Sequence, residues 1–324
     1  MDTNGIVNEV DRTYKKVKSL AGWTVDKNVV LTITSYYVTS EREFFAENLN
    51  HAMDSLKENS SWLSPLRGNL LPMIAAFLDK PGVDINEETA RLFHKQRVLR
   101  NEGFRNTIHS YLAALLMTDD STLYEQEAKN AKSLYNEMKK THFFLTSDDD
   151  YAYAVLLAKK NENPVEHARS MRLYYDALRV KGLRSGDELQ WMSQLMTYVD
   201  INFEEQLVSR AISILDCFKK EAKVQPLHYP MVAFLTVFGV SNTEITEIIE
   251  LTHALEDSKL FSWNKEMALS IAMGYIMREL TDSHEEIGVS LIASIELIVQ
   301  AQQAVIAATM ASMAASSANN PANH

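Results

Sequence analysis

The amino-acid sequence predicts an all-α protein, an α-solenoid of about seven helical hairpins with a period of about 40 residues. Three observations predict this fold. Apolar residues recur at helical spacing along most of the chain, the 324 residues include only seven Pro and ten Gly, and a helix–turn–helix pattern returns at a nearly constant interval. One hairpin cannot bury its own apolar face, so stacked neighbours would cover it and build one elongated, right-handed body.

The clearest unit is NAKSLYNEMKKTHFFLTSDDDYAYAVLLAKK, residues 130–160. Its two helices each have one apolar face, formed by Ala131, Leu134, Tyr135 and Met138 in the first and by Tyr151, Ala152, Val155 and Leu156 in the second. Ser147 or Asp148 is suited to cap the second helix, because its side-chain oxygen can accept from free N–H groups of the first turn. The segment therefore predicts two helices joined by a short turn.

A fixed offset supports the repeat. Each unit has an apolar residue in its turn, and these anchors lie 37 to 41 positions apart: Trp23, Leu63, Phe104, Phe144, Leu183, Val224 and Phe261. Of the 28 positions seven, eight, eleven and twelve residues beyond the anchors, 23 are apolar, whereas about 13 would be expected from the composition. The exceptions are Thr34, Ser35, Gln190, Gln194 and Thr236. We expect these 28 positions to form the core, with Leu115, Leu156, Leu195 and Leu235 equivalent and buried.

The helices follow in order along the chain. A first helix over 4–21 has Ile6, Val10, Tyr14 and Val17 on one face. The run VVLTITSYYV at 29–38 is rich in β-branched residues, but it falls where the repeat requires a helix. The hairpins are then expected at 27–40 and 41–58, 67–79 and 86–101, 106–118 and 121–141, 148–159 and 164–181, 186–199 and 203–221, and 228–239 and 243–258, with a last clear helix at 264–279.

The C-terminal segment differs from the repeats, which we assign to 1–281. It predicts one long apolar helix within 282–316, without Lys or Arg, followed by a disordered tail at 317–324. Two interpretations stay open for the helix. It is an end cap on the last hairpin, or it is a self-association helix that would form a homodimer through 282–315. Glu296 and its glutamines make it a poor membrane span.

Composition excludes several classes of function. The net charge of −11 makes a general nucleic-acid binder or a protein held on anionic lipid unlikely. Cys217 is the only cysteine, so it cannot form an internal disulfide, and we expect a buried, inert thiol. The N-terminal residues lack the basic start and apolar run of a signal peptide, so a cytoplasmic location is expected.

No motif predicts catalysis, a cofactor or a metal. Asp148, Asp149 and Asp150 could offer oxygen ligands to a hard cation, but a helix cap with dipole-compensating acids explains them equally well. His142 lies in the same turn, without a readable partner for acid–base chemistry. The phosphate-binding patterns GxGxxG and GxxxxGK[ST] are absent from the sequence, as are GxSxG and HExxH.

Basic residues recur near the ends of equivalent helices: Arg97 and Arg100, Lys139 and Lys140, Arg179 and Lys181, and Lys219 and Lys220. In a stack of hairpins they would line one edge. They either compensate the negative ends of helix dipoles or form a basic stripe for an acidic peptide or a nucleic-acid backbone. With His142, the candidate partner-binding residues are therefore Lys139, Lys140, Arg179, Lys181, Lys219 and Lys220.

The segments MKKTHFFLTSDDD and LQWMSQL, with the text around them, resemble a bacterial family designated domain of unknown function four-thousand-and-three. The resemblance covers roughly residues 25–280 and implies a bacterial, cytosolic, helical protein, without assigning a site. The rhythm of the units also resembles pentatricopeptide and tetratricopeptide repeats. Pentatricopeptide units are shorter and usually basic, and their recurring base-reading side chains are not evident here.

The leading hypothesis is a non-enzymatic scaffold that presents a concave surface to a protein or peptide partner. An RNA-binding helical-repeat protein is the first alternative. An enzyme with an unrecognised site in the concave groove is the second, because catalytic residues can converge in space without a motif. The partner, its pathway and the oligomeric state do not follow from the sequence.

Overall fold

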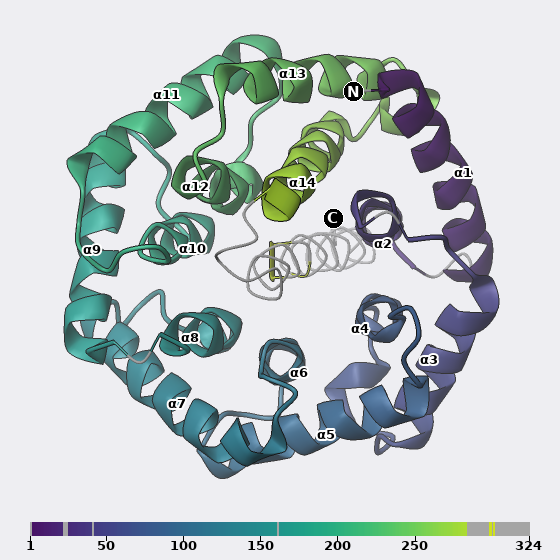
Figure 1. The fold of residues 1–324 in the computed structure, drawn as a ribbon, viewed down its shortest axis with the longest axis vertical. Coiled ribbons are helices and arrows are strands. Elements are labelled where there is room, and N and C mark those ends of the chain that lie inside the picture. Colours follow the sequence, from purple (N-terminus) through teal and green to yellow (C-terminus); the bar gives the residue numbers. More distant parts are fainter. Residues whose placement is uncertain are drawn as a thin grey trace, which may run out of the picture. The chain divides into compact units, whose positions relative to one another are not determined.

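The computed structural model of the chain describes residues 2–21, 25–40, 42–160, 162–283, 298, 299 and 301. This part of the chain has fourteen α-helices, short 3₁₀ turns and no strand, which confirms the predicted all-α class (Figure 1). The chain divides into two compact units. The N-terminal unit takes in Asp2–Thr89 and the described residues from Val299 onward, and the C-terminal unit is Ala90–Ile298.

The N-terminal unit alternates amphipathic and buried helices. Its helices are α1 (Thr3–Ala21), α2 (Lys27–Thr39), α3 (Ala46–Glu58), α4 (Leu71–Leu78) and the first part of α5 (Ile85–Asn101). The amphipathic α1 packs on α2, α3 packs on α4, and α2 and α4 are neighbours. α1 buries four residues of one helical face, among them Val10 and Val17. In contrast, α2 is buried from Val29 to Thr39 and α4 along its whole length.

The β-branched run at 29–38 forms the middle of α2, so the helix required by the repeat is confirmed over a strand. Hydroxyl groups inside the helix need partners because α2 is buried on all sides. The hydroxyl of Thr34 donates to the carbonyl of Val30 at 2.8 Å, and that of Thr39 donates to Ser35 at 2.9 Å. Such bonds to the preceding turn satisfy the hydroxyls without a second element.

The C-terminal unit continues the alternation. Its buried helices are α6 (Ile108–Leu115), α8 (Tyr151–Ala158), α10 (Asp187–Leu195), α12 (Tyr229–Val237) and α14 (Lys265–Ser283), and its amphipathic helices are α7 (Tyr124–Thr141), α9 (Pro164–Val180), α11 (Glu205–Glu221) and α13 (Asn242–Glu256). Each buried helix packs on the next buried helix, and α7, α9, α11 and α13 also contact in sequence. We call the two sets inner and outer helices, because the amphipathic helices lie outside the buried ones (Figure 1).

The inner helices of the C-terminal unit run parallel. At the start of α8, the Tyr151 hydroxyl accepts from the backbone N–H of Arg105, just before α6, at 3.3 Å. At the start of α12, the Tyr229 hydroxyl accepts from the N–H of Arg184, just before α10, at 3.4 Å. At the other end, Lys160 after α8 donates to the carbonyl of Val199 after α10. We call the side where α6, α8, α10, α12 and α14 begin the amino edge and the side where they end the carboxyl edge.

The predicted helices are all present where the structure describes the chain, and their ends differ by a few residues. The largest difference is at the beginning of α3, and several inner helices begin later than expected because a separate 3₁₀ turn precedes them. The 3₁₀ turns are η1 (Pro65–Arg67), η2 (Ser121–Leu123), η3 (Asp148–Asp150), η4 (Pro226–His228) and η5 (Lys259–Phe261). These turns contain residues that favour caps and tight turns, such as Asp, Ser and Pro.

Of the 28 expected core positions, 26 are buried, and the other two, Leu70 and Leu115, are half-buried. The expectation of full burial is therefore confirmed for Leu156, Leu195 and Leu235 and wrong for Leu115, which is the last residue of the short helix α6. The expected buried thiol is also corrected, since Cys217 on α11 is partly exposed. It lies toward the side of an outer helix, where one face remains in solvent.

The C-terminal helix expected at 282–315 lies mostly outside the described residues, as does the tail at 317–324. Asp282 and Ser283 close α14. Beyond them only Ile298, Val299 and Ala301 are described, and all three are buried. None of the helices in the described ranges has both the length and the apolar character needed to cross a membrane.

Candidate functional site

The amino edge holds the basic residues that the sequence singled out. Each outer helix of the C-terminal unit ends there, because a turn leads from it into the next inner helix. The seven candidates lie at the ends of three outer helices: Lys139, Lys140 and His142 at α7, Arg179 and Lys181 at α9, and Lys219 and Lys220 at α11. They are therefore distributed along one edge and do not converge on one point.

Several of these cations have acidic neighbours. Lys140 Nζ lies 2.6 Å from Glu137 Oε1, and Lys219 Nζ lies 3.4 Å from Asp216 Oδ1. Lys181 lies 3.8 Å from Glu205, while Arg179 donates to the carbonyl of Leu183. A continuous basic stripe is thus interrupted by carboxylates, which favours compensation of helix dipoles over a polyanion site.

This interpretation makes a prediction for RNA. We expect a poly-uridine resin not to retain the protein at about 50 mM salt. Phosphate contacts are strongest at low salt, so a polyanion site would be detected under this condition. Reversing Lys139, Lys140, Lys219 and Lys220 to Glu should leave that result unchanged. Retention of the wild-type protein that falls steeply with salt and disappears in the reversed variant would instead identify a polyanion site.

His142 packs in the turn after α7. Its ring meets Tyr175 edge-on with 4.3 Å between ring centroids. Burial and the nearby Arg172 lower its pKa, an effect opposed by Asp176 and Gln190. Arg172 in turn donates to Asp176 at 2.8 Å. The imidazole is thus held against α9 as part of the packing between the outer helices.

A surface hollow of about 400 Å³ opens at the end of α7, lined by Ser133, Asn136, Glu137, Lys139, Lys140 and Phe143. Beside it, Phe143 and Phe144 are 65% and 96% exposed, with ring centroids 5.5 Å apart. Phe144 was an expected turn anchor, but its side chain does not enter the core. Two adjacent exposed Phe side chains are unusual on a folded surface, because each offers a large apolar area to water.

The three aspartates after this turn have different environments. Asp148 accepts from the Tyr151 hydroxyl at 2.7 Å and lies 3.4 Å from Arg105. Asp149 accepts from the hydroxyl of Ser147. Asp150 is buried and accepts from the Ser147 N–H, so that Ser147 and Asp150 form a capping box, as the predicted cap requires. No group of three His, Cys, Asp or Glu side chains that could hold a metal occurs in the described residues.

Asp150 lies in a buried polar network. Its Oδ1 accepts from Gln190 Nε2 at 2.9 Å and from Gln194 Nε2 at 2.7 Å. Burial and the nearby Asp149 together raise the pKa of this carboxyl to about 8, against the opposing effect of its hydrogen bonds. The adjoining recess, lined by His142, Thr146 and both glutamines among others, has a volume of about 10 Å³, room for about one water molecule. It is too small to admit a substrate.

A further titratable group at the amino edge was not singled out from the sequence. His109 at the start of α6 is half-buried, which lowers its pKa, and Asp149 and Asp148 oppose this shift. Burial raises the pKa of Asp187, at the start of α10, to about 6. His109 and Asp149 stand at the same offset from their repeat anchors, five residues beyond Phe104 and Phe144. A comparison of polar residues at equal offsets from the anchors could have found His109.

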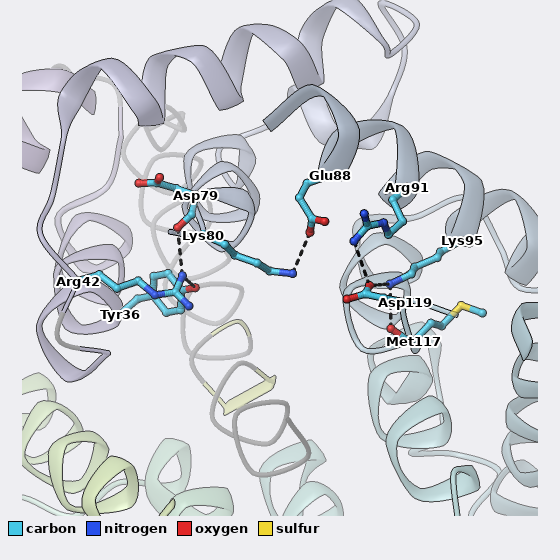
Figure 2. Close-up of polar contacts among 9 residues, drawn as sticks. All are labelled: Tyr36, Arg42, Asp79, Lys80, Glu88, Arg91, Lys95, Met117 and Asp119. Carbon is cyan, nitrogen blue, oxygen red and sulfur yellow. Dashed lines mark hydrogen bonds and ion pairs between the residues drawn. The ribbon is translucent and has the colours of Figure 1, made fainter. Parts of the chain in front are cut away.

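The carboxyl ends of inner helices are closed by cations from neighbouring segments (Figure 2). In the C-terminal unit, Lys95 Nζ donates to the carbonyl of Met117 at 2.9 Å and to Asp119 at 2.7 Å. Arg210 donates in the same way to the carbonyl of Val240. Cations here satisfy the last carbonyls and oppose the negative end of the helix dipole, which gives this edge a structural role.

The N-terminal unit has its own polar network at the ends of α2 and α4 (Figure 2). Arg42 donates to the carbonyl of Asp79 at 3.0 Å and to the hydroxyl of Tyr36 at 2.7 Å. The Tyr37 hydroxyl donates to the Asp79 carboxylate at 2.8 Å. Lys80 pairs at 2.9 Å with Glu88, whose side chain is almost fully buried. These contacts close the ends of the two inner helices.

The fold and the site thus define an all-α protein of paired helices with a polar amino edge. A family model described as a protein of unknown function, DUF4003, matches residues 13–304, and the chain belongs to this family. The uncharacterized protein YeaA of Bacillus subtilis (strain 168) is a relative, 26% identical over 319 residues that cover 96% of this chain and 95% of YeaA. No solved structure matches the chain.

Proposed function

We propose that the chain is a non-enzymatic helical-repeat scaffold, an α-solenoid, that binds a protein or peptide partner at the hollow on α7. The observation that carries the proposal is the exposure of Phe143 and Phe144 beside Lys139 and Lys140. The repeated packing of inner helix on inner helix and outer helix on outer helix in the C-terminal unit supports the solenoid.

The chemistry of the hollow indicates the kind of partner. Covering both phenyl rings would remove apolar surface worth about 25 cal/mol per Å². The lining holds Lys139 and Lys140 against one acidic residue, Glu137. The complementary ligand is therefore an acidic peptide segment with a large apolar side chain, since opposite charge would orient the segment and the apolar group would supply affinity.

The other two candidate functions have less support in the geometry. RNA binding would require cations that converge on a backbone, and here they are spread along the edge with acidic neighbours. A catalytic site would require a cleft in which reactive groups meet a substrate. At the amino edge, His142 instead lines a recess of about one water molecule, and Asp150 is bonded to the two glutamines that also line it.

A double substitution tests the proposed surface. Phe143→Ser with Phe144→Ser should abolish the retention of partners from a native lysate, measured by quantitative mass spectrometry against the wild-type protein, because both apolar anchors are removed. The fold should be unaffected, since both side chains are exposed. Val165→Ser is a matched control, as Val165 is an exposed apolar residue at the start of α9 outside the hollow.

A defined ligand supplies the second readout. Peptides selected from a displayed random library on the wild-type protein should combine acidic residues with an aromatic or large aliphatic residue. They should fail to bind the double variant and bind the Val165→Ser control normally. If the double variant retains the same lysate proteins and the same peptides as the wild type, the hollow is not the binding surface.

A further inference from the structure

A second pocket opens between α7, the end of α8 and the start of α9, and its chemistry differs from that of the hollow. It has a volume of about 60 Å³ and a mixed lining: Asn130, Ser133, Leu134, Leu157, Ala158, Glu162, Pro164 and His167. The apolar residues form walls, and the polar residues are placed to orient a ligand. Polar groups set among apolar walls are typical of a specific small site.

The hydrogen bonds around His167 fix its tautomer. The imidazole is 2% exposed, and its Nε2 lies 2.9 Å from Thr197 Oγ1. The Thr197 hydroxyl already donates its proton to the carbonyl of Gln194 at 2.7 Å. Thr197 can therefore only accept from the ring, so Nε2 carries the proton. The other ring nitrogen, Nδ1, is left as an acceptor in the neutral imidazole.

A second acceptor faces this nitrogen. Glu162 Oε2 lies 3.6 Å from His167 Nδ1, beyond hydrogen-bond distance. The same oxygen is buried and has no hydrogen-bond partner in the described part of the chain. Burial lowers the pKa of His167 to about 4, so the ring does not supply a charge to Glu162. Two neighbouring acceptors without a donor are complementary to a donor group that lies beside both of them.

We propose that this pocket binds a primary ammonium group, held by Glu162 and His167. An ammonium carries three donors and no acceptor, so it can donate to the carboxylate and to Nδ1 together. Leu134, Leu157 and Pro164 provide an apolar wall for the methylene stem. Burial raises the pKa of Glu162, Lys160 lowers it and Asp200 raises it. An ammonium bound to the carboxylate opposes the effect of burial, because it stabilises the charged form.

Other ligands fit the pocket less well. A divalent or transition metal would find one carboxylate and one imidazole, fewer than the three protein ligands of usual zinc sites. A water molecule could donate to both acceptors, but it would leave the carboxylate charge uncompensated in a partly buried position. The ammonium could come from a free amine or from a lysine side chain of a bound polypeptide, and the same chemistry recognises both.

Titration of the full-length protein followed by NMR tests the site. We use n-propylammonium as a free amine and N-acetyl-lysine amide as a peptide-like lysine. At least one should bind saturably with a dissociation constant on the order of 1–10 mM. N-acetyl-ε-acetyl-lysine amide, which lacks the ammonium, should not bind. Stronger binding of the lysine amide would indicate a polypeptide lysine, and stronger binding of propylammonium a free amine.

The variants separate the site from the fold. Glu162→Gln keeps the shape of the side chain and removes its charge, and it should weaken binding by roughly tenfold or more, as expected for the loss of a charge-assisted hydrogen bond. Glu166→Gln, in the first turn of α9 and exposed, should bind as the wild type does. The proposal is overturned if neither amine binds at concentrations of tens of millimolar, which are roughly ten times the expected dissociation constant. Equal affinity of Glu162→Gln or equal binding of the acetylated probe would also overturn it.

Discussion

Leu156→Ala is expected to lower the free energy of unfolding by about 2–5 kcal/mol. Leu156 is fully buried in α8, whose eight residues are all buried. The helix contacts α6 and α10 beside it and α7 outside it. Because neighbours surround α8, the structure cannot collapse into the space that the side chain leaves. The cost therefore includes a cavity in addition to the lost transfer energy.

Urea denaturation followed by circular dichroism measures this change, with the slope of the transition checked for constancy. Leu115→Ala is the informative control, because Leu115 stands at nearly the same offset in the preceding repeat but is only half-buried. Its cost should be clearly smaller. A loss below half a kcal/mol for Leu156→Ala, or the larger loss for Leu115→Ala, would show that α8 is not packed as described.

The sequence predicted the helices and the core well because both depend on local periodicity. A single offset from the turn anchors identified the buried positions of every inner helix, and the β-branched run in α2 was assigned correctly on that basis. The failure at Leu115 comes from the end of a helix, where neighbours are fewer. The exposure of Phe144 could not be predicted, since the exact course of a turn is not encoded in apolar spacing.

The polar exceptions to the pattern are buried, and their partners could not be predicted from local sequence. The hydroxyl of Thr236 donates to the carbonyl of Val232 one turn earlier at 2.7 Å, as Thr34 does in α2. Gln190 and Gln194 instead bind Asp150, some forty residues away. A hydroxyl on a helix has a partner within reach, but a buried glutamine requires one from another helix.

The candidate site was predictable only in part. The lysines were found because they recur at helix ends, but their acidic neighbours follow from side-chain geometry. The run of three aspartates indicated a cap, and the structure confirms it while burying Asp150. Sequence alone assigns the same chemistry to all three. Their separation into an ion-paired carboxylate, a turn acceptor and a buried acid depends on which side of η3 meets α10.

His228 occupies the position in η4 that Asp150 occupies in η3, and it also closes a capping box. The ring is fully buried, and its Nδ1 accepts from the N–H of Gln225 at 2.9 Å. Nε2 therefore carries the proton and donates to the carbonyl of Glu266, also at 2.9 Å. Protonating Nδ1 would place an N–H against the N–H of Gln225. Neutral imidazole is thus the form that fits this site.

His228 is consequently expected to destabilise the fold in mild acid. Burial lowers the pKa of His228 to about 4 from its ordinary value of 6.5. Between these values the unfolded chain binds a proton that the folded chain does not, so the free energy of unfolding falls as the pH falls. The slope from one histidine is about 1.4 kcal/mol per pH unit, and the full loss is about 3 kcal/mol. Asp150, whose pKa is raised to about 8, has an opposite slope of about the same size over this range and offsets that of His228 in the wild-type protein, whereas His167, whose pKa burial also lowers to about 4, adds to the loss.

A variant isolates the contribution of His228. In His228→Gln, the amide oxygen can accept from Gln225 and the amide nitrogen can donate to Glu266, but the side chain does not titrate. Between pH 6.5 and pH 4.5 the variant should lose about 2–3 kcal/mol less than the wild type, measured by urea denaturation at each pH. His51→Gln, on the exposed face of α3, should follow the wild-type profile. If the profiles of His228→Gln and the wild type remain parallel over this range, His228 does not resist protonation in the folded chain, and the hydrogen-bond arrangement at the start of α12 is different from the one described.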